Sequence, residues 1–180
     1  MLRRLPPSAN RLDHFFVVTV DGESLSIPYR SYNAEPPDNI ALGDATLDDV
    51  VRWCYFSRHH NGYVRQRCLR HLLVRTETWV VPFVVQLVGE YVIEIIEDIR
   101  KGLDLRPGSE AAARYGRFVA DNPAFFDLTS HRVTSYWSCY HRLRFPVMHP
   151  GSDSKFEEYP GFTLIAALRS ASMTMSESER

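Results

Sequence analysis

The alternation of apolar and polar residues near the start of the chain predicts a β-hairpin over residues 14–28. Two β-prone runs flank Asp21 and Gly22, and in the second run apolar residues alternate with serines. The Asp-Gly pair favours a two-residue type I′ turn, which needs positive φ at both positions. Pro28 ends the second strand or places it at an edge. Because an isolated hairpin is marginally stable in water, we expect it to pack on helices that follow.

After a loop rich in Pro, Asn and Gly, apolar residues recur with a helical period. Thr46 and Asp49 have the spacing of a capping box and begin an amphipathic helix that breaks at residues 59–62. A second amphipathic helix is predicted over about residues 63–74. From residue 79 to 102 the apolar phase continues through Gly89, so one long helix and two helices joined by a turn both remain open.

The second half of the chain also reads as helical. Thr78 is a candidate cap for the segment that begins at residue 79, and Ser109 is a candidate cap for a helix that ends at Asn122-Pro123. Further helices are predicted over about residues 130–143 and 162–168. The last residues, 169–180, are rich in Ser, Met and Glu, and we expect them to form a disordered tail.

These elements predict a mainly α fold, either a compact bundle or a short solenoid of four to six helices, with an N-terminal β-hairpin. The 180 residues, 44% hydrophobic and 24% charged, have the composition of an ordinary globular domain and exclude a wholly disordered chain. We expect one domain over residues 1–168, because this length is enough to bury a core.

Sequence features that bear on the compartment point to the cytoplasm. The basic start of the chain is not followed by an apolar segment, so we expect no secretory signal, and no apolar run reaches the length of a membrane span. The chain has three cysteines, Cys54, Cys68 and Cys139. Their odd number and wide spacing indicate no set of disulfides, as is usual in the reducing cytoplasm.

Charge is segregated along the chain although the formal net charge is only -1. Between Asp49 and Glu77 there is no acidic residue, and six arginines are interleaved with aromatic residues and histidines. A second acid-free stretch lies between Asp127 and Asp153. Basic surface with aromatic residues is typical of nucleic-acid binding, and an acidic protein partner would use the same surface. A solvated helix face with the aromatic side chains in the core is the other interpretation.

Arg65 is the one charged residue that falls inside the apolar arc of its helix. A guanidinium taken out of water needs hydrogen-bond acceptors, so we expect Arg65 to be a buried structural anchor. Carbonyls near residues 57–60 are candidate acceptors, as are the carboxylates of Glu90 and Glu94. The alternative is that Arg65 extends its head group to solvent.

The segment His60-Asn61-Gly62-Tyr63-Val64-Arg65-Gln66-Arg67-Cys68-Leu69 resembles the second helix of a HEAT-like repeat, and Gly89-Glu90-Tyr91-Val92 echoes its start. The resemblance covers residues 46–103 and departs from the repeat pattern at His59 and Ile93. It implies a degenerate HEAT/armadillo-like helical-repeat protein that acts as a binding scaffold, in which the matching arginine, Arg65, ties neighbouring repeats together.

Residue patterns that carry catalysis or metal binding are not found in the sequence. Three glutamates have the spacing i, i+4 and i+7, namely Glu90, Glu94 and Glu97. No histidine accompanies them at the Glu-x-x-His spacing of carboxylate metal sites, so we interpret them as a solvated acidic face. Zinc-ligand spacing is absent around His59, His60, Cys68 and His71. No nucleotide-binding or nucleophile motif occurs. We therefore expect no catalytic residues, no metal and no cofactor. A third alternative, an unrecognised hydrolase or lyase, would need a deep pocket that holds Glu90 or Glu94 beside a histidine.

These observations predict a non-catalytic binding or scaffold module. Its arginine-rich helical surface would hold an acidic protein partner or a second copy of the chain, and the alternative is a nucleic-acid-binding protein that uses the same surface. We expect no association with membranes. The predicted binding residues are Arg52, Arg58, His59, His60, Arg67 and Arg70.

Overall fold

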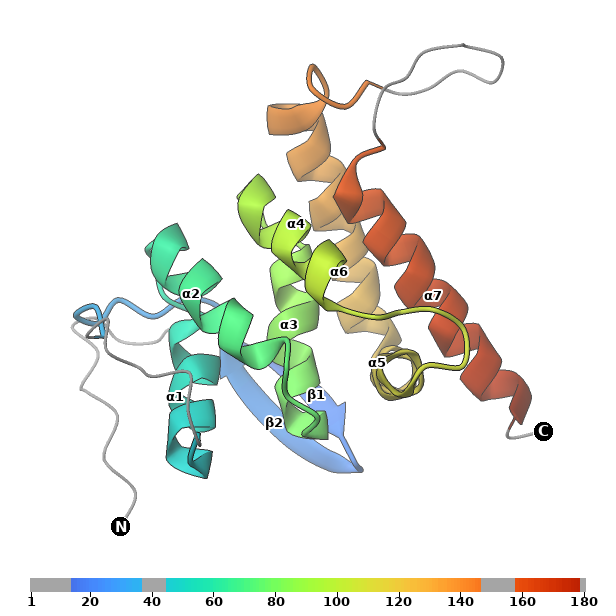
Figure 1. Ribbon diagram of the computed structural model, residues 1–180, viewed down its shortest axis with the longest axis horizontal. Coiled ribbons are helices and arrows are strands. Elements are labelled where there is room, and N and C mark those ends of the chain that lie inside the picture. Colours follow the sequence, from blue (N-terminus) through green and yellow to red (C-terminus); the bar gives the residue numbers. More distant parts are fainter. Residues whose placement is uncertain (1–13, 37–44, 147–157, 179–180) are drawn as a thin grey trace. The chain divides into compact units, whose positions relative to one another are not determined.

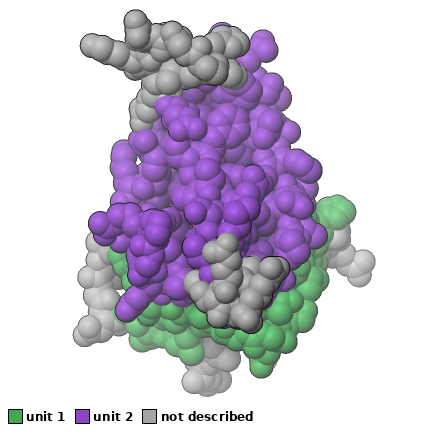
Figure 2. Space-filling view, turned by 90° about the vertical axis from the view of Figure 1, so that its right-hand side faces the viewer, with its two compact units in different colours: residues 1–84 green, residues 85–180 purple. Residues whose placement is uncertain are grey.

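The protein is described by a computed structural model over residues 14–36, 45–146 and 158–178. The chain divides into two compact units, residues 1–84 and 85–180, which are described separately below (Figure 2). Within the described ranges the structure is mainly helical, with seven α-helices and an N-terminal two-stranded antiparallel sheet (Figure 1). The predicted fold class is thus confirmed. None of the described helices has the length and apolar character needed to cross a membrane.

The N-terminal hairpin pairs β1 (Phe15–Val20) with β2 (Glu23–Pro28) in antiparallel register. Asp21 and Gly22 form the turn with φ values of 51° and 81°, as a type I′ turn requires. One face of the ladder is buried and the other is exposed, in the period-two pattern of a half-buried sheet. The buried residues are Phe16, Val18 and Ile27.

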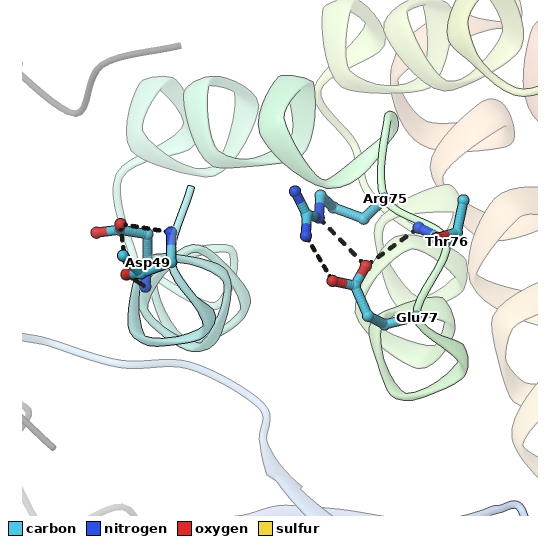
Figure 3. A network of polar contacts seen from close by, with 5 residues as sticks. Asp49, Arg75, Thr76 and Glu77 are labelled. Carbon is cyan, nitrogen blue, oxygen red and sulfur yellow. Dashed lines mark hydrogen bonds and ion pairs between the residues drawn. The ribbon is translucent and has the colours of Figure 1, made fainter. Parts of the chain in front are cut away.

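Two helices, α1 (Leu47–Phe56) and α2 (Gly62–Leu72), follow the hairpin in the first unit. The predicted capping box is present, because the Asp49 N–H donates to Thr46 Oγ1 (3.3 Å) and the Thr46 N–H donates to Asp49 Oδ2 (3.1 Å) (Figure 3). Asn61 caps α2 by accepting a hydrogen bond from the Tyr63 N–H (2.9 Å). Both caps satisfy N–H groups that the first turn of a helix leaves without a partner.

The connection from α2 to α3 (Val81–Val88) passes through a 3₁₀ turn, η1 (Thr78–Val80). An ion pair precedes this turn, in which the Arg75 guanidinium donates to both Glu77 carboxylate oxygens at 3.2 and 2.6 Å (Figure 3). Hydrogen bonding from Arg75 lowers the pKa of Glu77. Thr78 begins the 3₁₀ turn and its hydroxyl donates to Asp21 in the hairpin turn, so it links these two parts of the first unit.

The apolar stretch from residue 79 to 102 forms two helices, α3 and α4 (Ile93–Gly102), which resolves the alternative that the sequence left open. The break follows Gly89. A Cβ at this position would lie 3.3 Å from side-chain atoms of Thr129 and Arg132 on α6 (Pro123–Tyr136). The glycine therefore allows a close approach between the end of α3 and α6 in the second unit.

In the second unit, α5 (Glu110–Asp121) lies beside α7 (Pro160–Ser178) (Figure 1). Ser109 caps α5 as predicted, since its hydroxyl accepts a hydrogen bond from the Ala112 N–H (3.0 Å). Gly116 marks the closest approach, because a Cβ there would lie 2.4 Å from the backbone oxygen of Ala171. This contact makes Gly116 a packing requirement of the helix pair.

Two predicted boundaries in the second unit are wrong. The helix expected from residue 130 begins at Pro123, where the missing N–H of proline is tolerated, and ends in a π-helix, η2 (Trp137–His141). The helix expected to end at Leu168 continues to Ser178, so residues 169–178 are helical where we expected a tail. Ala171 is buried in this extension, and packing of this face explains why the polar composition did not prevent helix formation.

Candidate functional site

The predicted site lies around the turn between α1 and α2, where a backbone segment crosses it. The Ser31 N–H donates to the Arg58 carbonyl (2.8 Å), and the His60 N–H donates to the Ser31 carbonyl (3.0 Å). The chain that leaves the hairpin is thereby held against the turn. As a result, Arg58 and His59, which we expected on a binding surface, are at most 1% exposed, and that part of the prediction is wrong.

Arg58 binds the end of the hairpin rather than an external ligand. Its Nη2 donates to the Tyr29 carbonyl (2.9 Å) and its Nε to the Pro28 carbonyl (3.3 Å). A third hydrogen bond joins Nη1 to the Ser57 carbonyl (3.4 Å). A buried guanidinium needs such acceptors, because an unpaired charge in the interior carries a large free-energy cost. Arg58 therefore fastens β2 to the end of α1.

His59 is fixed by one hydrogen bond on each ring nitrogen. The Asn61 N–H donates to Nδ1 (3.1 Å), which assigns the ring proton to Nε2 and makes Nε2 the donor to the Asn33 carbonyl (2.9 Å). The Asn33 side chain accepts a further hydrogen bond from the Tyr55 hydroxyl (2.6 Å). His59 thus joins the crossing segment to the start of α2.

Arg65 lies where the helical pattern places it, fully buried on α2. Its Nη1 donates to the carbonyls of His59 and His60, both at 2.9 Å. These acceptors fall within the range 57–60 considered from the sequence. The guanidinium satisfies two turn carbonyls in the protein interior, where hydrogen bonds to a charged donor are strong.

On α2, Arg67 is half-buried and His71 is buried. Arg67 Nη2 donates to the Pro36 carbonyl (3.0 Å), which extends the contact with the crossing segment. The His71 ring stacks on Trp53, with centroids 4.4 Å apart and planes 10° from parallel. Burial, and then the nearby Arg67 charge, lower the pKa of His71.

The lowered pKa of His71 predicts a loss of stability in mild acid. The unfolded chain binds a proton at a pKa of about 6.5, whereas the folded chain binds it only at lower pH, so the free energy of unfolding falls as the pH drops below about 6.5. Urea unfolding at several pH values measures this slope. We expect His71→Phe, which keeps an aromatic ring beside Trp53, to flatten it, and an unchanged slope in this variant would contradict the assignment.

One face of α2 remains open to solvent, and it lies opposite the buried one. Tyr63 is 84% exposed and Val74, just beyond the helix end, is 76% exposed. Arg70 is exposed and Arg67 is half-buried. At i, i+4 and i+7 of the helix, Tyr63, Arg67 and Arg70 project in similar directions, and Val74 follows the helix end. We call Tyr63, Arg67, Arg70 and Val74 the α2 surface.

Two further predicted binding residues lie near this part of the first unit. His60 is exposed and stacks on Tyr32, with ring centroids 5.4 Å apart and planes 14° from parallel, and Arg52 is half-buried on α1. Tyr32 and Val74 were not among the predicted binding residues, and Tyr63 was noted only as one of the aromatic residues between the arginines. For Tyr63 and Val74 the signal was available, because a helical projection places them opposite the apolar arc.

The acidic face predicted from Glu90, Glu94 and Glu97 is only partly present. Glu94 is exposed, and Glu97 accepts a hydrogen bond from Arg144 (2.9 Å) and lies 4.0 Å from Lys101. Glu90 is buried, so its assignment to a solvated face is wrong. The break between α3 and α4 is the reason, because it interrupts the helical phase that placed the three glutamates together.

Two thiols lie in the α1–α2 pair. Cys54 and Cys68 are buried free thiols, and burial raises the pKa of Cys68 to about 12 and that of Cys54 well above its ordinary value. At neutral pH both are protonated and therefore weak nucleophiles. Within residues 14–36, 45–146 and 158–178, no three His, Cys, Asp or Glu side chains gather in a group able to hold a metal ion.

The arginines of the first unit fall into a buried group and a solvent-exposed group. Arg58 and Arg65 bind backbone carbonyls in the interior, whereas the α2 surface presents cationic and aromatic groups to solvent. Comparison with known proteins gives no match to a family model, to a curated protein or to a solved structure. The HEAT-like resemblance stays a prediction.

Proposed function

We propose that the protein is a binding module that holds an acidic protein partner on the α2 surface. The observation that carries the proposal is the 84% exposure of Tyr63 on a helix that also presents Arg70. Tyrosine and arginine are the residue types that, with tryptophan, most often dominate the binding energy of protein interfaces. Tyrosine is enriched at interfaces because its ring buries a large apolar area while its hydroxyl can keep a hydrogen-bond partner.

The sign of the charge supports an acidic partner. Residues 50–76 contain six arginines and no acidic residue. Arg58 and Arg65 are buried and Arg75 is paired with Glu77, so the exposed positive charge comes from Arg52, Arg67 and Arg70. These groups attract acidic surfaces over several ångströms and disfavour basic ones. Arg52, His60, Arg67 and Arg70 are the predicted binding residues that keep solvent-accessible area.

The buried arginines support the same function by making the surface rigid. Arg58 and Arg65 tie the hairpin exit, the turn and α2 together through backbone carbonyls. A binding surface that is ordered before the partner arrives loses less conformational entropy on association. The HEAT-like resemblance also implies a binding scaffold rather than a catalyst.

Charge reversal at Arg70 tests the proposal. The full chain is immobilised, proteins are captured from the native host, and the affinity of each purified candidate is then measured by calorimetry. We expect Arg70→Glu to weaken binding of the true partner at least about tenfold, because it places like charges together. Arg142→Glu, an exposed arginine of the second unit, is the matched control and should bind as the unmodified chain does.

Two results would contradict this function. One is a partner that binds Arg70→Glu as tightly as the unmodified chain. The other is tight binding of nucleic acid that Arg70→Glu abolishes, with affinity that falls steeply as salt rises, since that dependence reports phosphate contacts. The second result would establish the nucleic-acid alternative for the same surface. Sedimentation of the purified chain shows whether a second copy is the partner.

A further inference from the structure

Each strand of the N-terminal hairpin has an outer edge that its partner strand does not cover. In the part of the chain that the structure describes, the sheet consists of β1 and β2 alone, so neither outer edge pairs with a further described strand (Figure 1). The N–H and C=O groups along such an edge can pair with a strand of another molecule. The two outer edges differ in whether they allow this pairing.

The hydrogen-bond pattern of the hairpin determines which backbone groups reach the outer edges. The Tyr29 N–H donates to the His14 carbonyl (3.0 Å), so these two residues form a hydrogen-bonded pair. In an antiparallel ladder, hydrogen-bonded and non-hydrogen-bonded pairs alternate. The next pair, Phe15 with Pro28, is therefore of the second kind, and Val17 follows in the same phase. The backbone groups of these residues point away from the opposite strand.

The outer edge of β2 is blocked. Pro28 has no N–H to donate at this edge, and its carbonyl accepts a hydrogen bond from Arg58 Nε (3.3 Å). The next carbonyl, that of Tyr29, accepts a hydrogen bond from Arg58 Nη2 (2.9 Å). Glu23 adds a charge at the other end of the strand. Prolines and charges are among the features by which natural proteins prevent the addition of a strand.

The outer edge of β1 lacks this protection. The strand, Phe15–Val20, contains no charged residue and no proline, and its one-to-one register with β2 leaves no bulge. Phe15 and Val17, whose backbone groups reach the edge, also expose their apolar side chains, at 48% and 63%. An uncharged, apolar edge strand of this kind is the type that pairs with another strand.

We propose that β1 pairs in antiparallel orientation with β1 of a second copy of the chain, so that two hairpins form one four-stranded sheet. The strand itself supplies what the edge requires of a partner, namely backbone groups in the same phase and exposed apolar side chains at alternate positions. Antiparallel pairing about Val17 overlaps the two strands over most of their length. Because β1 carries no charge, the identical strand is not repelled and an acidic partner is not attracted.

The difference between the two edges also determines the size of the assembly. Pairing through β1 uses the open edge of both copies, and the blocked β2 edges then lie on the outside. The contact is isologous and closes at two copies, whereas an open edge on both strands would continue into a fibre. A sheet of four strands is also of ordinary size, whereas an isolated two-stranded sheet is only marginally stable. This dimer does not involve the α2 surface and goes beyond the proposed function.

Analytical ultracentrifugation of the full chain over a range of concentrations tests the proposal. We expect an equilibrium between monomer and dimer. Val17→Lys should weaken dimerisation at least about tenfold, because it places like charges opposite each other at the two-fold axis. Ser26→Lys is the matched control, since Ser26 is exposed and lies opposite Val17 on β2. It adds the same charge to the same face of the hairpin, away from the paired edge, and should leave the dimer unchanged.

Hydrogen exchange of the unmodified chain locates the interface without any substitution. The Val17 N–H points to the outer edge of β1, so it should become protected at the concentrations at which the dimer forms. The Ser26 N–H points to the outer edge of β2 and should exchange at the same rate at every concentration. Circular dichroism verifies that Val17→Lys and Ser26→Lys are folded.

Three results would overturn the proposal. The first is a monomer at every concentration, and the second is a dimer in which the Val17 N–H gains no protection. The third is a dimer that Ser26→Lys weakens as much as Val17→Lys does, since this would show that the faces of the hairpins associate rather than their edges. Arg70→Glu should dimerise as the unmodified chain does, and loss of the dimer in this variant alone would place the second copy on the α2 surface instead. Absence of the β1 dimer leaves capture of an acidic protein by the α2 surface unaffected.

Discussion

Replacing Arg65 with alanine is expected to lower the free energy of unfolding by about 3–5 kcal/mol. The guanidinium is fully buried and donates two hydrogen bonds of 2.9 Å to the carbonyls of His59 and His60. Alanine leaves those carbonyls without their charged donor and empties the space filled by the side chain, and both effects destabilise the folded state. Chemical denaturation followed by circular dichroism measures the change.

Arg70→Ala is the matched control for this prediction. It removes the same chemical group from the same helix, at an exposed position. Surface substitutions of this kind change stability by no more than about 0.5 kcal/mol in most proteins. Equal unfolding midpoints for Arg65→Ala and Arg70→Ala would show that Arg65 is not an anchor.

The second large effect is expected at the contact between α5 and α7. Gly116→Ala places a methyl group 2.4 Å from the backbone oxygen of Ala171 and 2.6 Å from its carbonyl carbon. Because these are backbone atoms, one helix must move, and overpacking of this kind costs about 3 kcal/mol. We expect the loss to appear as a lower urea midpoint.

Gly102→Ala provides the comparison, since it makes the same change at an exposed glycine at the end of α4. Alanine restricts the unfolded chain more than glycine does, so this variant should be neutral or stabilised by up to about 1 kcal/mol. If Gly116→Ala proves as stable as Gly102→Ala, the close approach of α5 and α7 is not a requirement of the fold.

Local signals in the sequence were sufficient for several elements of the fold. The Asp21-Gly22 turn, the Thr46–Asp49 capping box and the Ser109 cap each depend on residues a few positions apart, and each is found as predicted. The burial of Arg65 follows from helical phase alone. Each of these features depends on residues close together in the sequence, so local sequence alone determines which groups come into contact.

Features that depend on distant contacts were not predictable from a single sequence. Arg58 and His59 lie in a polar turn, and only the segment that crosses it, through Ser31 and Asn33, buries them. The extension of α7 to Ser178 likewise depends on packing rather than on composition. In each case the burying partner is far away in the sequence, so neither periodicity nor composition carries the information.

The candidate site, too, was predictable from the sequence only in part. The acid-free stretch drew attention to α2, but it did not distinguish interior arginines from exposed ones. The ring contacts of Tyr91 with Tyr136 and Tyr140 were not predicted, because these residues lie some 45 to 49 positions apart in the chain. Charge segregation therefore predicts a region, and the contacts of individual side chains determine what each residue does.

The affinity of a captured acidic partner for Tyr63→Ala is the most direct measurement of the proposed function. Tyr140→Ala serves as the control, since it removes a tyrosine that is also well exposed but lies in the second unit. If the α2 surface is the interface, calorimetry should show binding to Tyr63→Ala weakened by about 2 kcal/mol, roughly thirtyfold, and binding to Tyr140→Ala unchanged. Unchanged affinity for Tyr63→Ala, with the variant folded, would contradict the assignment of α2 as the binding surface.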